Sequence, residues 1–155
     1  LMDRGIYLFD TSSIPNDASI SAAVFSIICG GDNGSNFSQT CDLVLSTVAS
    51  NTSLAAADFQ GTVGNTILQS DDQPALSSFT CDSVTYKDYT LNATGRGNIS
   101  LTGITKLGLR LSGDRTNTAP TWSSSLTAGK QLMTSEMKTG ITGYTERWYI
   151  GLDCT

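Results

Sequence analysis

The chain has 155 residues, nine Lys and Arg against fourteen Asp and Glu, a net charge of −5 and no histidine. This length suits a single domain, residues 1–155, with one core. Nucleic acid is not an expected partner, because neutralising phosphates needs a basic patch and the basic residues here are scattered. No apolar run approaches the roughly 20 residues that cross a bilayer as a helix, so we expect no membrane span.

The missing histidine also argues against an enzyme. Neither a Ser-His-Asp nor a Cys-His arrangement can be built without the imidazole that acts as general base. A pair of carboxylates could still hydrolyse glycosides, but Glu136 and Glu146 are the only glutamates and most aspartates lie in turn-like sequence. We expect no catalytic residues.

The elements expected in chain order are short and rich in β-forming residues. The first two are strands at 4–9 and 19–29, joined by a turn that contains Pro15, Asn16 and Asp17. Further strands are expected at 41–48, 78–86, 89–92, 105–112, 130–133 and 147–154, and short helical turns at 53–59 and 93–101. Residues 30–39 and 69–78 are the loosest segments by composition.

Apolar residues alternate along three of these strands, which is the pattern of a sheet with one buried face. Such faces must be buried against each other, and two stacked antiparallel sheets achieve this. The sequence therefore predicts an all-β sandwich. The faces are Ala23, Phe25, Ile27 and Cys29; Leu107, Leu109 and Leu111; and Trp148, Ile150, Leu152 and Cys154.

Four cysteines, Cys29, Cys41, Cys81 and Cys154, lie far apart and lack the close pairs of a zinc ribbon. We expect two disulfides. The pairing favoured is Cys29 with Cys41, because a strand is expected to end at Cys29 and the glycine-rich run after it can turn the chain back. Cys81 would then pair with Cys154. A Cys29 to Cys154 bridge stays open, as do four reduced thiols in a cytosolic protein.

Five Asn-X-Ser/Thr sequences are candidate glycan acceptors. Each one alone is weak, and turn-forming asparagine is the structural alternative. Together with paired cysteines, they favour an extracellular protein. The five asparagines are Asn33, Asn36, Asn51, Asn92 and Asn98.

Two kinds of ligand site are considered. Calcium prefers carboxylate and carbonyl oxygens, which loops holding Asp10, Asp32, Asp71, Asp72 and Asp114 could supply, although no EF-hand spacing exists. Structural calcium is therefore the one cofactor left open, and no other metal or cofactor is expected.

Aromatic side chains could instead stack on sugars. The candidates are Trp122, Tyr144 and Tyr149, while Trp148 next to Tyr149 is assigned to the opposite, buried face. For Trp122, packing against the end of the sandwich is the favoured interpretation.

The opening run Tyr7-Leu8-Phe9-Asp10-Thr11-Ser12-Ser13-Ile14-Pro15, followed by Ile20 to Ile27, resembles a known signature. It is similar to the DNRLRE-like family of extracellular jelly-roll modules, which is related to carbohydrate-binding modules and occurs in secreted bacterial, archaeal and phage proteins. Segments 50–59, 89–95, 103–110 and 117–124 follow in the same order. The resemblance covers about residues 4–125 and implies a jelly roll outside the cell, on a cell surface or on a virion.

The chain departs from that family at both ends. Residues 146–154 take the place of the usual closing strand, and family members carry a further strand before the opening one. The resemblance therefore implies a sandwich with one incomplete edge, which a strand from another chain would complete. A fragment of a larger protein and a trimmed, self-sufficient fold are the alternatives.

Two functions follow as expectations. The favoured one is a non-enzymatic subunit of a surface filament, fibre or virion appendage, self-associating through strand contacts at Arg4, Ile6 and Leu8. The alternative is a carbohydrate-binding module of a larger secreted enzyme or phage tail fibre, with a glycan as its ligand.

Overall fold

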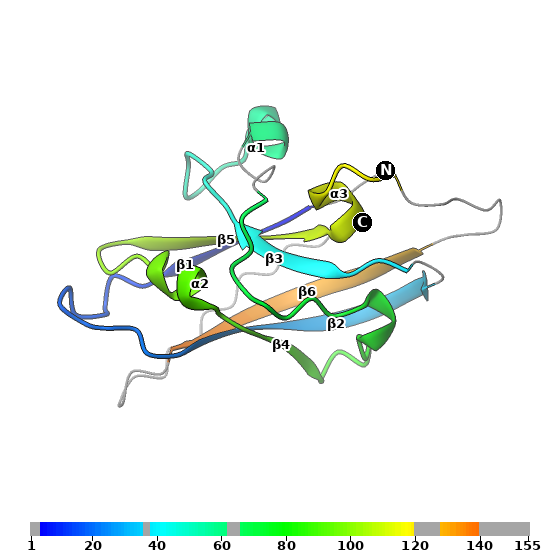
Figure 1. The fold of residues 1–155 in the computed structure, drawn as a ribbon, viewed down its shortest axis with the longest axis horizontal. Helices are drawn as coiled ribbons and strands as arrows, with labels where there is room; N and C mark the ends of the chain where they lie inside the picture. The colour runs from blue at the N-terminus through cyan, green and yellow to red at the C-terminus, as the bar shows by residue number, and fades with distance from the viewer. Residues whose placement is uncertain (1–3, 36–37, 62–65, 120–127, 140–155) are drawn as a thin grey trace.

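The computed structural model describes residues 4–35, 38–61, 66–119 and 128–139; side chains are not described at 33–35, 59–61, 128–131 and 133–139. Six strands dominate these residues (Figure 1), with short helical turns between them. The strands are β1 (Gly5–Asp10), β2 (Ala23–Ser35), β3 (Cys41–Leu45), β4 (Tyr86–Thr90), β5 (Ile104–Leu111) and β6 (Ala128–Thr139). The helical elements are α1 (Ala56–Gly61), η1 (Leu76–Ser78), α2 (Ala93–Gly97) and α3 (Ser112–Arg115).

The strands form two three-stranded antiparallel sheets, with strand orders β1-β5-β3 and β4-β2-β6. The expectation of an all-β protein is confirmed. The finer connectivity of a jelly roll is still a prediction. No described helix is long and apolar enough to cross a membrane.

The core lies between the two sheets and centres on Phe25, whose side chain is fully buried. Its ring meets Tyr7 and Phe9 of the other sheet at centroid distances of 5.2 and 6.0 Å, and Tyr89 of its own sheet at 5.8 Å. The predicted inward face of β2 is therefore confirmed, since Ala23, Phe25, Ile27 and Cys29 are all at most 1% exposed. Burial of these side chains away from water favours the stacking of the two sheets.

Residues 67–75, which we call the bridging segment, run along the outer edge of β3. Leu45 N–H donates to the carbonyl of Ile67 at 3.1 Å, and Gln69 N–H donates to the carbonyl of Leu43 at 2.9 Å. Further along, Cys41 N–H donates to the carbonyl of Pro74 at 2.9 Å. These bonds satisfy β3 backbone groups that point away from β5.

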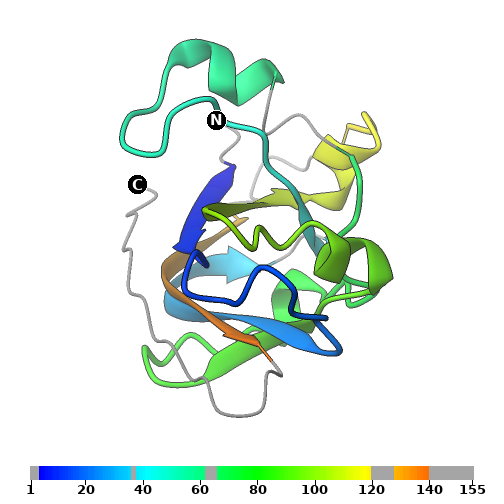
Figure 2. The same ribbon diagram turned by 90° about the vertical axis from the view of Figure 1, so that its left-hand side faces the viewer.

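The same segment also bonds the end of β4 in the other sheet. Ser70 Oγ donates to the carbonyl of Thr90 at 2.6 Å, and Thr90 N–H donates to Asp72 Oδ2 at 2.7 Å. Asn92 N–H donates to the carbonyl of Gln69 at 3.0 Å. Most of 69–78, expected to be loose, is thus a bonded connection between the sheets. Figure 2 shows it on the side of the sandwich opposite β1 and β6.

β2 is longer than expected and begins later. It starts at Ala23 and continues to Ser35 through residues assigned to a loop. Pairing with β6 continues across this glycine-rich stretch, with register shifts at Ile28/Cys29, Cys29/Gly31 and Asp32/Ser35. Irregularities of this kind let extra residues enter a ladder without ending it. Cys29 therefore lies within a strand.

The position of Cys29 overturns the favoured disulfide pairing. Cys29 is bonded to Cys81, with a Cα–Cα distance of 4.4 Å, and not to Cys41. Cys41 begins β3 in the opposite sheet, where it is a buried free thiol, and burial raises its pKa to about 12. With Cys29 already paired to Cys81, the bridges proposed for Cys154 from either residue are also wrong; Cys154 itself lies outside the described residues.

The strand expected at 78–86 is wrong. Instead η1 covers Leu76–Ser78, and the chain then stays irregular until β4. The cause is a side-chain turn at Asp82, which accepts hydrogen bonds from Thr85 Oγ1 at 2.6 Å and from the N–H groups of Val84 and Thr85. Such local bonds compete with a strand ladder, and the bonds from Thr85 lower the pKa of Asp82 to about 2.

Candidate assembly edge

β1 is the terminal strand of its sheet and pairs with β5 over its whole length. Thr11 N–H donates to the carbonyl of Gly103 at 3.0 Å, one residue beyond the β1 to β5 ladder. In an antiparallel ladder, bonded and non-bonded pairs alternate, so the peptide groups of Ile6 and Leu8 point away from β5. They are directed to the side of the sandwich opposite the bridging segment.

The side chains of Ile6 and Leu8 pack within the chain. Ile6 is 8% exposed and contacts the buried Val48 and the half-buried Leu8 on the outer face of the sheet. Lys106 Nζ donates to the carbonyl of Val48 at 2.6 Å and helps hold that segment down. At these two predicted assembly residues, the peptide groups are therefore available at the edge of the described sheet, whereas the side chains pack against the chain itself.

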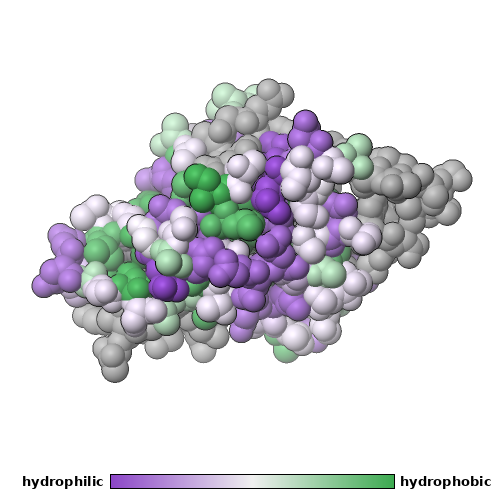
Figure 3. Space-filling model, in the orientation of Figure 1, coloured by the Kyte–Doolittle hydropathy of each residue, from purple (hydrophilic) through white to green (hydrophobic). Residues whose placement is uncertain are grey.

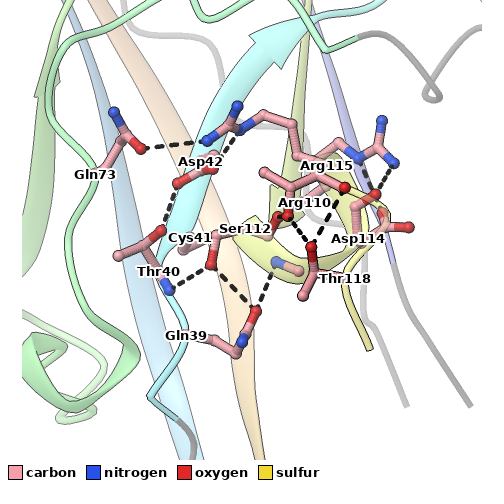
Figure 4. A network of polar contacts seen from close by, with 12 residues as sticks. Gln39, Thr40, Cys41, Asp42, Gln73, Arg110, Ser112, Asp114, Arg115 and Thr118 are labelled. Atoms are coloured by element: carbon pink, nitrogen blue, oxygen red, sulfur yellow. Dashed lines mark hydrogen bonds and ion pairs between the residues drawn. The ribbon is translucent and has the colours of Figure 1, made fainter. Parts of the chain in front are cut away.

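Arg4, the third predicted assembly residue, is anchored inside the chain. Its Nε and Nη2 donate to the two carboxylate oxygens of Asp114, each at 2.7 Å. Arg110 Nε donates to Asp114 Oδ2 at 2.9 Å (Figure 4). Burial alone would raise the pKa of Asp114, but the bonds and charges of the two guanidinium groups bring it below its ordinary value. Asp114 on α3 thus fixes the beginning of β1.

A second part of this polar network fixes α3 to β3 (Figure 4). Asp42 is fully buried and accepts from Arg115 Nε at 2.6 Å and Thr40 Oγ1 at 2.7 Å. Gln39 Oε1 accepts from the N–H of Gly113 at 2.6 Å. A buried charge costs much less free energy when it is paired and hydrogen-bonded. The network therefore ties α3, which holds the start of β1 through Asp114, to β3 of the same sheet.

The aspartates considered for calcium interact with other residues of the chain. Asp10 accepts from the N–H and Oγ of Ser12, Asp71 from Asn92, and Asp72 from Thr90. The polar contacts of Asp114 are those with the arginines given above, and Asp32 lies in β2. Across the described ranges no group of three or more His, Cys, Asp or Glu residues could hold a metal ion.

Of the remaining predicted site residues, three have described side chains, and all three are candidate glycan acceptors. Asn51 is exposed, and Asn92 and Asn98 cap the two ends of α2. A small cavity of about 160 Å³ lies beside the disulfide, next to Phe79 and Lys87, and is well below the usual size of a ligand site. Asn36, Trp122, Tyr144, Tyr149 and Cys154 lie outside the described residues, as does the side chain of Asn33.

Sequence reasoning missed the bridging segment and the arginine network. The signal for the first was the cluster Gln69-Ser70-Asp71-Asp72-Gln73, whose side chains suit capping of backbone groups as well as a loop. The network had no local signal, because Arg4 and Asp114 are 110 residues apart. Comparison of the chain with protein-family models, curated proteins and solved structures finds no match.

Proposed function

We propose that this protein is a non-enzymatic structural module outside the cell, a subunit of a filament, fibre or virion appendage that assembles by strand pairing at β1. The observation that carries the proposal is the difference between the two edges of the β1-β5-β3 sheet. The bridging segment bonds the β3 edge, whereas β1 ends the sheet in the described structure with the peptide groups of Ile6 and Leu8 directed outward.

Strand addition suits such an edge. An incoming strand gains main-chain hydrogen bonds from the row of outward peptide groups. The incoming strand is assigned to a second copy of this chain. The Arg4–Asp114 ion pair favours this role, because an anchored β1 keeps the edge extended and ready to pair.

The location is supported by the Cys29–Cys81 disulfide, since stable disulfides are typical of oxidising compartments. The resemblance of residues 4–125 to DNRLRE-like jelly-roll modules points the same way and supplies the jelly-roll connectivity as part of the proposal. A sandwich stapled by a disulfide suits an exposed surface structure.

The test compares wild type with Leu8→Pro and Leu8→Ala by electron microscopy and light scattering over a range of protein concentrations. Proline at position 8 removes an N–H that points away from β5, so the β1 to β5 ladder keeps its bonds while the edge loses a donor. Leu8→Ala removes the same packing but keeps the N–H. Polymers are expected from wild type and Leu8→Ala, and few or none from Leu8→Pro.

Polymers that Leu8→Pro leaves unchanged would refute the role of β1. A second result would also refute it: protein that stays monomeric at every concentration and whose Leu8 amide is protected from hydrogen exchange. The edge would then be covered by the chain's own residues. Monomers that bind on a glycan array would favour the carbohydrate-binding alternative.

A further inference from the structure

The sequence Asn51-Thr52-Ser53 lies between β3 and α1, and all three residues are exposed. Ser50 Oγ accepts from the N–H groups of Thr52 and Ser53, each at 3.1 Å. These bonds close a tight turn and place Asn51 within it, outside any helix or strand. The side-chain amide of Asn51 has no hydrogen-bond partner among the described residues.

The other two acceptor sequences whose side chains are described differ in this respect. Asn92 Nδ2 donates to Asp71 Oδ1 at 3.1 Å, and its Oδ1 caps α2 by accepting from Gly95 N–H. Asn98 Nδ2 donates to Oε1 of the fully buried Gln69 at 2.8 Å. A sugar on Nδ2 replaces one amide hydrogen, so at these two positions it would compete with a bond that holds the fold. At Asn51 it would not.

A second observation concerns the surface that follows Asn51. Leu54 is 58% exposed, and Ala55, Ala56 and Ala57 after it are exposed as well. On the face seen in Figure 3, hydrophobic residues (green) lie among hydrophilic ones (purple). A polar glycan attached next to this apolar run would shield it from solvent and from other proteins.

We propose that Asn51 is the attachment site of an N-linked oligosaccharide. Its Nδ2 forms a bond to the anomeric carbon of an oligosaccharide carried on a lipid pyrophosphate. The carbon–oxygen bond to the pyrophosphate breaks, the lipid pyrophosphate leaves with the electron pair, and one amide proton passes to a base. The inference rests on the proposed extracellular location and is independent of assembly.

The test directs the full chain into the secretory pathway of a eukaryotic host and measures the intact mass of the secreted protein. Release with peptide N-glycosidase in ¹⁸O water marks each occupied position as a labelled aspartate. Wild type is expected to carry a glycan at Asn51. Asn51→Gln and Ser53→Ala should each lose the mass of one glycan, and Asn98→Gln should keep it.

An unmodified Asn51 in secreted protein would overturn the inference, as would an unchanged glycan mass in both Asn51→Gln and Ser53→Ala. The state of Cys29 and Cys81 in the same sample separates this failure from that of the proposed location. An intact disulfide with bare Asn51 refutes only the glycan site, whereas free thiols at both cysteines also count against the extracellular proposal.

Discussion

The two long sides of the sandwich end in different ways. On the β3 and β4 side, the bridging segment bonds backbone groups of both edge strands, and Tyr89 Oη donates to the carbonyl of Cys41 across the core at 3.0 Å. On the β1 and β6 side (Figure 2), these two strands are the last ones described in their sheets. A described contact on this side is the ion pair between Arg4 and Asp114, which anchors the start of β1.

Under the proposed function, this difference means that one edge of the β1-β5-β3 sheet is bonded within the chain and the other is left to pair with a second copy. Edge strands carry rows of donors and acceptors that pair with other chains unless they are covered. Here the cover consists of side chains and peptide groups from a single short segment. The closed side is therefore expected to govern stability, and the β1 side to govern association.

The largest expected effect comes from the disulfide that ties the chain before β4 to β2. Replacing Cys29 and Cys81 together by alanine frees a loop with a sequence separation of 52, which costs about 4 kcal/mol of unfolding free energy in the chain-entropy model. Urea unfolding followed by circular dichroism measures the loss. Cys41→Ala, which removes a buried thiol without breaking a bridge, should cost about 1 kcal/mol. An equal loss of unfolding free energy in the two variants would show that the Cys29–Cys81 bridge does not stabilise the fold beyond the packing of its side chains.

The next effect tests the bridging segment directly. A Cβ on Gly95 would lie 2.1 Å from the carbonyl oxygen of Gln69, the same oxygen that accepts from Asn92 N–H. Gly95→Ala must push the segment away and should cost about 3 kcal/mol. In the same helix, a Cβ on Gly97 meets nothing within 4 Å, so Gly97→Ala should be neutral or slightly stabilising. Thermal unfolding of both variants checks this, and equal stability would remove the bridging segment as the cause.

The β1 side responds to the loss of its anchor. Asp114→Asn removes the charge that pairs with Arg4 and Arg110 and should cost about 2 kcal/mol at pH 7. Because folding lowers the pKa of Asp114, its contribution is complete above the ordinary carboxyl pKa of about 4 and is lost as the pH falls through the lower folded value. The difference between wild type and variant should therefore shrink below about pH 4.

Urea midpoints measured from pH 7 to pH 2 give that difference, and Asp10→Asn is the control. The pKa of Asp10 is also lowered, mainly by its bond from Ser12 Oγ, but this carboxylate is exposed and anchors no strand. A gap that stays constant down to pH 2 would contradict the role assigned to Asp114.

The sequence was a good guide to burial where alternation along a single strand decided it. Alternation in Ala23 to Cys29 and in Leu107 and Leu109 predicted buried faces, since period-two burial depends only on neighbours along one strand. At 78–86 it failed for a local reason, the turn at Asp82, and elsewhere it failed where distant residues decided the outcome. The glycines after Cys29 were assigned to a loop although β6, about 100 residues later, holds them in a ladder, and this error also produced the wrong disulfide.

The smallest expected effect concerns one hydroxyl on the closed side. Ser70 is fully buried, donates to the carbonyl of Thr90 and accepts from Asp72 N–H at 3.0 Å, so Ser70→Ala leaves two backbone groups without their partner and should cost about 1 kcal/mol. Ser46 is the matched control, because it is 2% exposed and its hydroxyl has no partner in the described structure. Ser46→Ala should therefore be neutral or stabilising, since it removes an unsatisfied buried polar group. If calorimetry gave both variants the same melting temperature, the side-chain bonds of the bridging segment could not be what stabilises this edge.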